Sequence, residues 1–126
     1  MPGNFRVKSD VWLAMQGGQP NHMGFDRGTS VDEGVAYTFQ LANSTTDQVF
    51  IVIDPAPDSG GIETVTCLAI VADQTISLKL GAAGSNVAFT MTANEPVILQ
   101  GISVTEASVS NSSGSTANVR VMIAGT

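Results

Sequence analysis

Hydrophobic and polar residues alternate with a period of two along most of the second part of the chain. In the clearest stretch, Val35, Tyr37 and Phe39 occupy one phase, and small or polar residues occupy the other. Successive side chains of a β-strand point to opposite faces of the sheet, so this alternation predicts a strand with one buried face. Because the pattern begins at Val35, we expect a β-sandwich domain over residues 35–126.

Comparable stretches recur about every ten residues, separated by Gly, Pro, Asn and Ser. They predict seven further strands, over residues 48–53, 62–72, 75–80, 87–92, 97–99, 102–109 and 117–124. Residues 43–47 are expected to form a turn, residues 110–115 a loop, and Gly101 a bulge. The predicted fold class is therefore all-β, an antiparallel β-sandwich of about eight strands of the jelly-roll or Greek-key type. A barrel is the alternative, because strand order cannot be read from one sequence.

Residues 1–34 do not show this regular alternation, because glycines and Pro20 interrupt any period. Only Asp10–Met15 is expected to form a short strand, within an otherwise irregular N-terminal arm. The arm holds the only Trp, the only His and two of the five Phe of the chain. Aromatic side chains on an extended arm commonly dock on another surface, either the chain's own sheet or a neighbour's. The candidate interface residues are Phe5, Trp12, His22, Phe25 and Arg27.

Charge narrows the range of partners. Charged residues make up 13% of the chain, about half the usual share, and the net charge is −6. The five basic residues are scattered, whereas phosphate binding needs clustered Lys and Arg, so we expect no nucleic-acid contact. A surface with so little charge fits a chain that is docked against protein neighbours.

Catalysis is not expected from these residues. His22 is the only imidazole base, Asp26 or Asp32 could orient it, and Ser30 is the conceivable nucleophile. Such a combination occurs by chance in most chains, and no Gly-x-Ser-x-Gly elbow is present. We therefore expect a protein that is not an enzyme and needs no cofactor.

Metal binding and membrane insertion are not indicated either. His22 and Cys67 lie too far apart in sequence to form a zinc-ligand pair. The acidic stretch over residues 54–63 could wrap calcium, but its spacing fits no EF-hand, and a solvated loop is the preferred interpretation. Cys67 is alone within an apolar run, which predicts a buried thiol and folding in a reducing compartment. No apolar run reaches the length of a membrane span, and no secretory leader is recognised.

Carbohydrate binding is the alternative from another functional class. Small β-sandwiches often stack sugars on exposed rings. Most rings here fall in strand patterns where burial is expected, namely Tyr37, Phe39, Phe50 and Phe89. A sugar site would therefore need Trp12 to face solvent.

The glycine-broken arm and the strands rich in Ser, Thr, Asn, Ala and Val, such as Val87–Thr92, resemble small virion proteins of tailed bacteriophages. The nearest group is the capsid decoration, or cement, proteins. The resemblance implies a non-enzymatic structural protein made in the host cytoplasm and located in the virion. There a β-domain sits on the outside of the capsid, while an arm or edge strand ties capsid subunits together. It also implies a homo-oligomer, often a trimer. A tail, collar or fibre-base component is the closest alternative.

Overall fold

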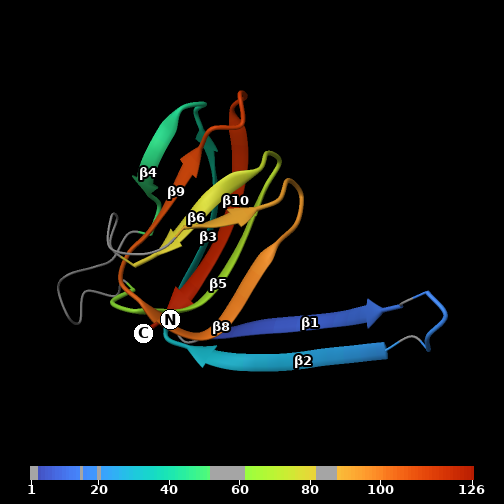
Figure 1. Ribbon diagram of the computed structural model, residues 1–126. Coiled ribbons are helices and arrows are strands. Elements are labelled where there is room, and N and C mark those ends of the chain that lie inside the picture. Colours follow the sequence, from blue (N-terminus) through green and yellow to red (C-terminus); the bar gives the residue numbers. More distant parts are fainter. Residues whose placement is uncertain (1–2, 15, 20, 52–61, 82–87) are drawn as a thin grey trace.

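The computed structural model describes residues 3–14, 16–19, 21–51, 62–81 and 88–126. These residues form a two-layer β-sandwich from which a long hairpin projects (Figure 1). The strands are β1 (Gly3–Leu13), β2 (Asn21–Val31), β3 (Glu33–Leu41), β4 (Thr45–Val49), β5 (Val65–Ala72), β6 (Ile76–Leu80), β7 (Phe89–Met91), β8 (Val97–Val104), β9 (Ala107–Asn111) and β10 (Ala117–Gly125). None of the described residues belongs to a helix long and apolar enough to cross a membrane.

The sandwich consists of two antiparallel four-stranded sheets. One has the strand order β3-β10-β5-β8, and the other has the order β4-β9-β6-β7. The chain passes from one sheet to the other at each step from β3 to β10 except between β6 and β7, which pair directly. Eight strands in two interleaved sheets are the jelly-roll arrangement. The predicted all-β, jelly-roll type of sandwich is therefore confirmed.

The core lies between the two sheets and follows from the period-two pattern. In β10, Val119, Val121 and Ile123 are buried while Arg120 and Met122 are exposed. Each large aliphatic side chain buried in this way contributes about 1.5 to 3 kcal/mol. The inner faces of the other strands supply the most deeply buried side chains, which include Leu41, Val65, Leu68, Ile70, Leu78, Met91 and Val109.

One buried polar side chain fastens the end of the sandwich. The Asn111 side-chain amide donates hydrogen bonds to the carbonyl oxygens of Leu41 (2.9 Å) and Ser115 (2.8 Å). Its carbonyl oxygen accepts a hydrogen bond from the backbone N–H of Ser113 (3.0 Å). A buried amide satisfied on both sides adds directional order that an apolar side chain cannot supply. Asn111 therefore ties β3 to the loop between β9 and β10.

The observed strand boundaries differ from several of the predicted ones, and two of the differences change the number or the start of the strands. The strand expected over residues 48–53 begins already at Thr45, and Asp47 adopts a left-handed conformation (φ 51°) where the pairing of β4 with β9 shifts register. The strand expected over residues 102–109 is divided, because β8 ends at Val104 and β9 begins at Ala107. The predicted irregularity at Gly101 is confirmed by its φ of +74° and by a register shift between β5 and β8. The acidic stretch over residues 54–63 lies largely outside the described residues.

The N-terminal arm is not irregular, and this is the main correction to the expected fold. Strands β1 and β2 pair without interruption from Gly3 opposite Val31 to Leu13 opposite Asn21. Two of the glycines taken into account, Gly24 and Gly28, lie inside β2, where a side chain approaches closely. A Cβ at Gly28 would lie 2.9 Å from the Asn4 side chain. Glycine within a strand often marks such an approach rather than a break.

Candidate functional site: the projecting hairpin

The β1–β2 hairpin is the most unusual feature of the molecule, because it leaves the sandwich and extends away from it (Figure 1). It forms a two-stranded sheet of its own. An isolated two-stranded hairpin is marginally stable in water and normally packs against another element. A hairpin of this length is therefore expected to find a surface to lie on.

The hairpin is amphipathic. Directly paired residues share a face, and the pairing of Val11 with Met23 and of Ser9 with Phe25 places these side chains on one side. Four apolar side chains in the outer half of this side, namely Val11, Leu13, Met23 and Phe25, are 47 to 57% exposed. We call these four residues the distal apolar face. Large apolar groups gathered and exposed in this way mark an interaction surface more often than a free one.

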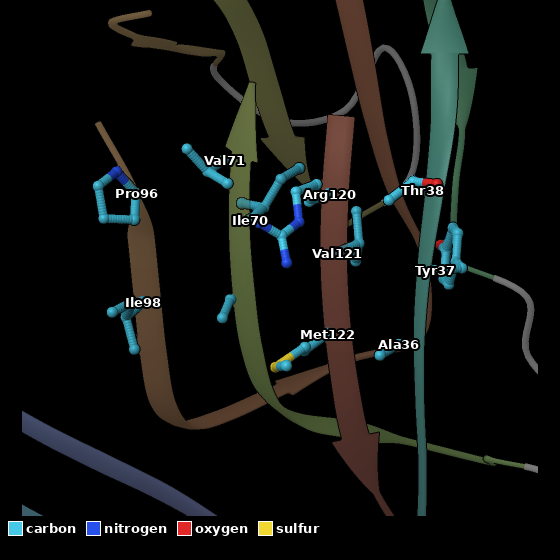
Figure 2. Close-up of a pocket in the computed structure, with 11 residues that line it drawn as sticks. Ala36, Tyr37, Thr38, Ile70, Val71, Pro96, Ile98, Arg120, Val121 and Met122 are labelled. Atoms are coloured by element: carbon cyan, nitrogen blue, oxygen red, sulfur yellow. The ribbon is translucent and has the colours of Figure 1, made fainter. Parts of the chain in front are cut away.

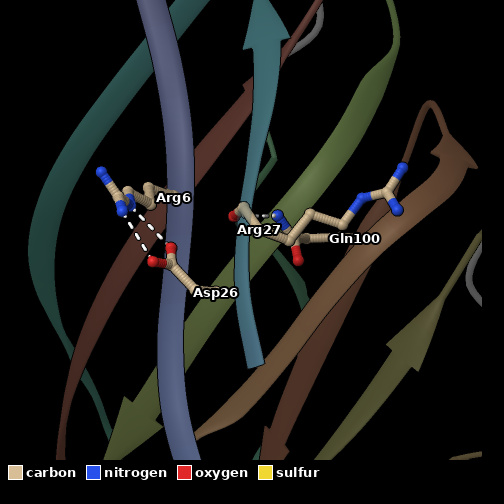
Figure 3. Close-up of polar contacts among 4 residues, drawn as sticks. All are labelled: Arg6, Asp26, Arg27 and Gln100. Atoms are coloured by element: carbon tan, nitrogen blue, oxygen red, sulfur yellow. Dashed lines mark hydrogen bonds and ion pairs between the residues drawn. The ribbon is translucent and has the colours of Figure 1, made fainter. Parts of the chain in front are cut away.

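The opposite side of the hairpin is polar and internally paired. Arg6 donates two hydrogen bonds to Asp26 (2.8 and 2.7 Å), and this contact holds the pKa of the Asp26 carboxyl below its ordinary value (Figure 3). His22 Nε2 lies 2.8 Å from Asp10 Oδ1. The His22 ring also stacks on Trp12, with ring centroids 4.2 Å apart. These contacts pair Arg6 with Asp26 and Asp10 with His22 on the polar side. The apolar side is left for docking.

The base of the hairpin is anchored to the sandwich. Val31 is buried in a small cluster with Cys67 and Ala124, and Phe5 packs against the cluster. The Gln100 side-chain amide donates hydrogen bonds to the Arg27 carbonyl oxygen (3.3 Å) and the Thr29 hydroxyl (3.2 Å), the first of which is drawn in Figure 3. The Asp32 N–H donates to the Gly125 carbonyl oxygen (2.9 Å). These contacts fix the direction in which the hairpin leaves.

Near this base, the outer face of the β3-β10-β5-β8 sheet is hollowed. A shallow groove of about 460 Å³ runs across all four strands of this sheet (Figure 2). We call the apolar side chains that face outward along it the outer sheet face; they are Ala36, Ala69, Val71, Ile98 and Met122. Arg120 is the basic residue in its lining. A second hollow of about 370 Å³ adjoins it at Ala36 and Met122 and reaches Phe5 of the hairpin.

All five predicted interface residues lie on the hairpin, but they do not form one surface. Phe5, Phe25 and Arg27 belong to the apolar side, and Trp12 and His22 to the polar side. Phe5 contacts the chain's own sandwich, whereas Phe25 remains 47% exposed.

The sequence interpretation missed Val11, Leu13 and Met23, although alternation from Phe5 to Leu13 was the available signal. It also missed Ile98 and Met122. Both are apolar residues in the outward phase of strands whose inner phase is already apolar, and this pattern could have revealed them.

The conceivable catalytic set is not brought together. His22 and Ser30 lie on the same strand eight positions apart, which corresponds to roughly 26 Å. The imidazole contacts Asp10 rather than the Asp26 or Asp32 considered from the sequence. Cys67 is buried, as predicted. Across the described ranges, no three His, Cys, Asp or Glu side chains are grouped as metal ligands would be.

The aromatic side chains are distributed as predicted, with one exception. Phe50 is buried, and Tyr37 and Phe39 are half-buried against the core. Phe89 was expected in the core but is 40% exposed at the end strand of its sheet. Trp12 is 66% exposed, which meets the condition set for a sugar site.

The fold and this site define a jelly-roll protein that carries a projecting amphipathic hairpin. No protein-family model matches the chain, and no curated protein matches its sequence. Among solved structures, the chain is similar to the cupin domain of Cnp3 from Schizosaccharomyces pombe. The TM-score is 0.49 at 10% sequence identity, over 96% of this chain and 84% of that one. A likeness at this level carries no argument about function.

Proposed function

We propose that this chain is a non-enzymatic virion structural protein, a decoration or cement protein that binds the outside of a tailed-phage capsid and stabilises contacts between subunits. The observation that carries the proposal is the projecting hairpin with its distal apolar face exposed. Such a face needs a protein partner, because leaving four large apolar side chains in water forgoes burial energy.

The magnitude of this burial agrees with a role in a lattice. Burying a large apolar side chain contributes about 1.5 to 3 kcal/mol, so covering four that are half-exposed contributes roughly 3 to 6 kcal/mol. Association costs at least about 4 kcal/mol in lost translational and rotational freedom. One hairpin alone therefore binds weakly. Many hairpins on one symmetric shell bind firmly, because each further contact is made at high effective concentration.

Charge supports a place on the outside of the shell. The net charge of −6 repels packaged DNA, and the few basic residues form no cluster that would bind phosphate. Low charge density also reduces repulsion between neighbouring copies on a crowded surface.

The test is binding to capsids assembled without this protein. The variant Met23→Thr/Phe25→Thr removes half of the distal apolar face while keeping residues that favour strands. Trp12→Thr is the matched control, because it removes a large ring from the opposite side of the same hairpin. We expect the wild type and the control to co-sediment with capsids and the double variant to lose binding. Equal binding of all three proteins would contradict the proposal.

A tail, collar or fibre-base role is distinguished by location. Gold-labelled protein on purified virions should decorate the capsid, and label confined to the tail or its base would replace the capsid role with the alternative.

A second candidate function is carbohydrate binding, and the exposure of Trp12 favours it. A ring exposed near the end of the hairpin can stack on a sugar. The sugar hypothesis predicts that wild-type protein binds a glycan array and that Trp12→Ala does not. A wild-type protein that binds no glycan removes this candidate.

A further inference from the structure

We propose that the distal apolar face docks on the outer sheet face of a second copy of this chain, so that copies exchange hairpins in a closed homo-oligomer. This inference deepens the proposed function and rests on it for the docking role of the hairpin: the distal apolar face meets a neighbouring copy, and the copies linked in this way bind the capsid together, so that a chain without the face also loses its capsid binding. It names the partner as an identical chain, the receiving surface as the β3-β10-β5-β8 sheet, and the residues that meet.

The molecule already makes this kind of contact within one chain. At the hairpin base, Phe5 and Val31 of the apolar side cover Cys67 and Ala124. Cys67 pairs with Ala124 across β5 and β10, two residues beyond Ala69 and Met122 on the same side of the sheet. The exposed part of the sheet thus continues a surface that the same side of a hairpin already covers. A second copy's hairpin would extend that contact.

The two surfaces also match in chemistry. The receiving groove is lined mainly by aliphatic side chains, and Ile98 and Met122 within it are 44 and 53% exposed. The side chains of the distal apolar face are exposed to a similar degree as Ile98 and Met122, and they are similar to them in size. Each copy therefore carries its own distal apolar face, which docks, and its own outer sheet face, which receives. Neither face is covered in the single chain. A surface made to bind an unrelated protein does not require this second, matching patch.

Charge favours a second copy's sandwich as the receiver. Residues 1–31 carry three basic and two acidic side chains, a net +1, and the remaining residues carry two basic and nine acidic ones, a net −7. Among the described residues, neither Lys8 nor Arg27 makes an ion pair with a carboxylate. The net charges of two sandwiches repel each other, while the net charge of a hairpin is attracted to that of the next copy's sandwich. This attraction acts between the whole units, because the charged residue of the receiving groove itself is the basic Arg120. The hairpin is thus the part through which identical chains can approach.

A closed oligomer is possible because each chain has one distal apolar face and one outer sheet face. Two copies can exchange hairpins about a two-fold axis, or a small ring can pass each hairpin to the next copy. In either arrangement, every distal apolar face and every outer sheet face is covered. Such an assembly contains as many hairpin–sheet contacts as chains. A substitution that disrupts the distal apolar face in every chain therefore removes all of these contacts together.

The first test measures the molar mass of the free protein by light scattering. At about 100 µM, the wild type and Trp12→Thr should have a molar mass of two or more times the 13.0 kDa of one chain. Met23→Thr/Phe25→Thr and, independently, Met122→Asp should weaken association by at least about 100-fold and run as monomers. A wild type that stays at 13.0 kDa overturns the inference, as does a double variant that remains oligomeric.

The second test does not depend on the stability of any disruptive variant. In a Cys67→Ala background, a Phe25→Cys chain is mixed with a Met122→Cys chain under mild oxidation. A disulfide-linked heterodimer should form rapidly. The control pair Trp12→Cys with Met122→Cys should cross-link at least about tenfold more slowly, because Trp12 lies on the other side of the hairpin. Equal rates for the two pairs overturn the inference.

Failure of this inference and failure of the proposed function look different. A wild type that is monomeric in solution, yet needs Phe25 to bind capsids, overturns hairpin exchange and leaves the virion role in place. A hairpin-exchanged oligomer that binds no virion part overturns the virion role and leaves the exchange in place.

Discussion

Replacing Asn111, the last residue of β9, with Ala should destabilise the sandwich more than any single substitution of a polar residue in the loop that follows it. The change removes the donors for the Leu41 and Ser115 carbonyl oxygens and the acceptor for the Ser113 N–H. The bond to Leu41 is buried, so its orphaned carbonyl costs about 1 to 3 kcal/mol, and each part-buried bond costs about 0.5 to 1 kcal/mol. The expected loss is therefore about 2 to 5 kcal/mol.

Thermal unfolding measures this loss. An unfolding entropy of about 2.1 cal/mol/K per residue gives roughly 0.26 kcal/mol/K for a chain of this length, so 3 kcal/mol lowers Tm by about 11 °C. Ser112→Ala is the matched control, because Ser112 is exposed in the same loop. All proteins are compared at one concentration. A loss below about 1 kcal/mol, or one equal to that of the control, would refute the role assigned to the Asn111 amide.

Two further predictions follow from the sandwich. Asn118 donates from its side-chain amide and its backbone N–H to Asp73 (2.7 Å each), and these hydrogen bonds lower the pKa of the Asp73 carboxyl below its ordinary value. The charged form of Asp73 therefore stabilises the fold above pH 4. The difference in Tm between the wild type and Asp73→Asn should shrink as the pH falls through the lowered pKa. A difference that is the same at every pH from 7 to 2 would contradict this. Leu68→Ala should cost about 2 to 5 kcal/mol in chemical denaturation, and Val71→Ala on the outward phase of the same strand much less; similar losses would contradict the assigned inner and outer faces.

The sandwich could be predicted from the sequence because its strands carry the period-two pattern locally. Val119, Val121 and Ile123 indicate the inner phase of β10 without knowledge of any partner strand. The break between β8 and β9 was missed because no Gly or Pro marks it; the signal that was present is the pair of polar residues Thr105 and Glu106, where the apolar positions shift from the even to the odd phase. The pairing order of the strands also depends on contacts distant in sequence, which a local pattern does not contain.

The hairpin was misread for a physical reason. Glycine often interrupts a strand, yet Gly24 and Gly28 lie within β2, where a Cβ would approach side chains of β1. The aromatic residues of the arm could be singled out from the sequence, but the faces on which they lie depend on the register of β1 against β2. That register sets Phe25 beside Ser9 and Trp12 beside His22, and it decides which rings can dock together.

The most direct test of the docking surface is the oxidation rate of individual methionines. Met23 on the hairpin and Met122 on the sheet are both more than half exposed in the single chain, while Met91 is buried and serves as an internal control. Peroxide converts exposed methionines to sulfoxides, and peptide mass spectrometry reports each rate separately.

We expect Met23 and Met122 to oxidise readily in dilute protein. Both should become protected together, by at least about tenfold, as the chain self-associates and when it is bound in particles. Met91 should stay slow throughout. Contradiction would come from a Met23 that oxidises as fast in the assembled protein as in the dilute monomer, because the distal apolar face would then be exposed in the assembly.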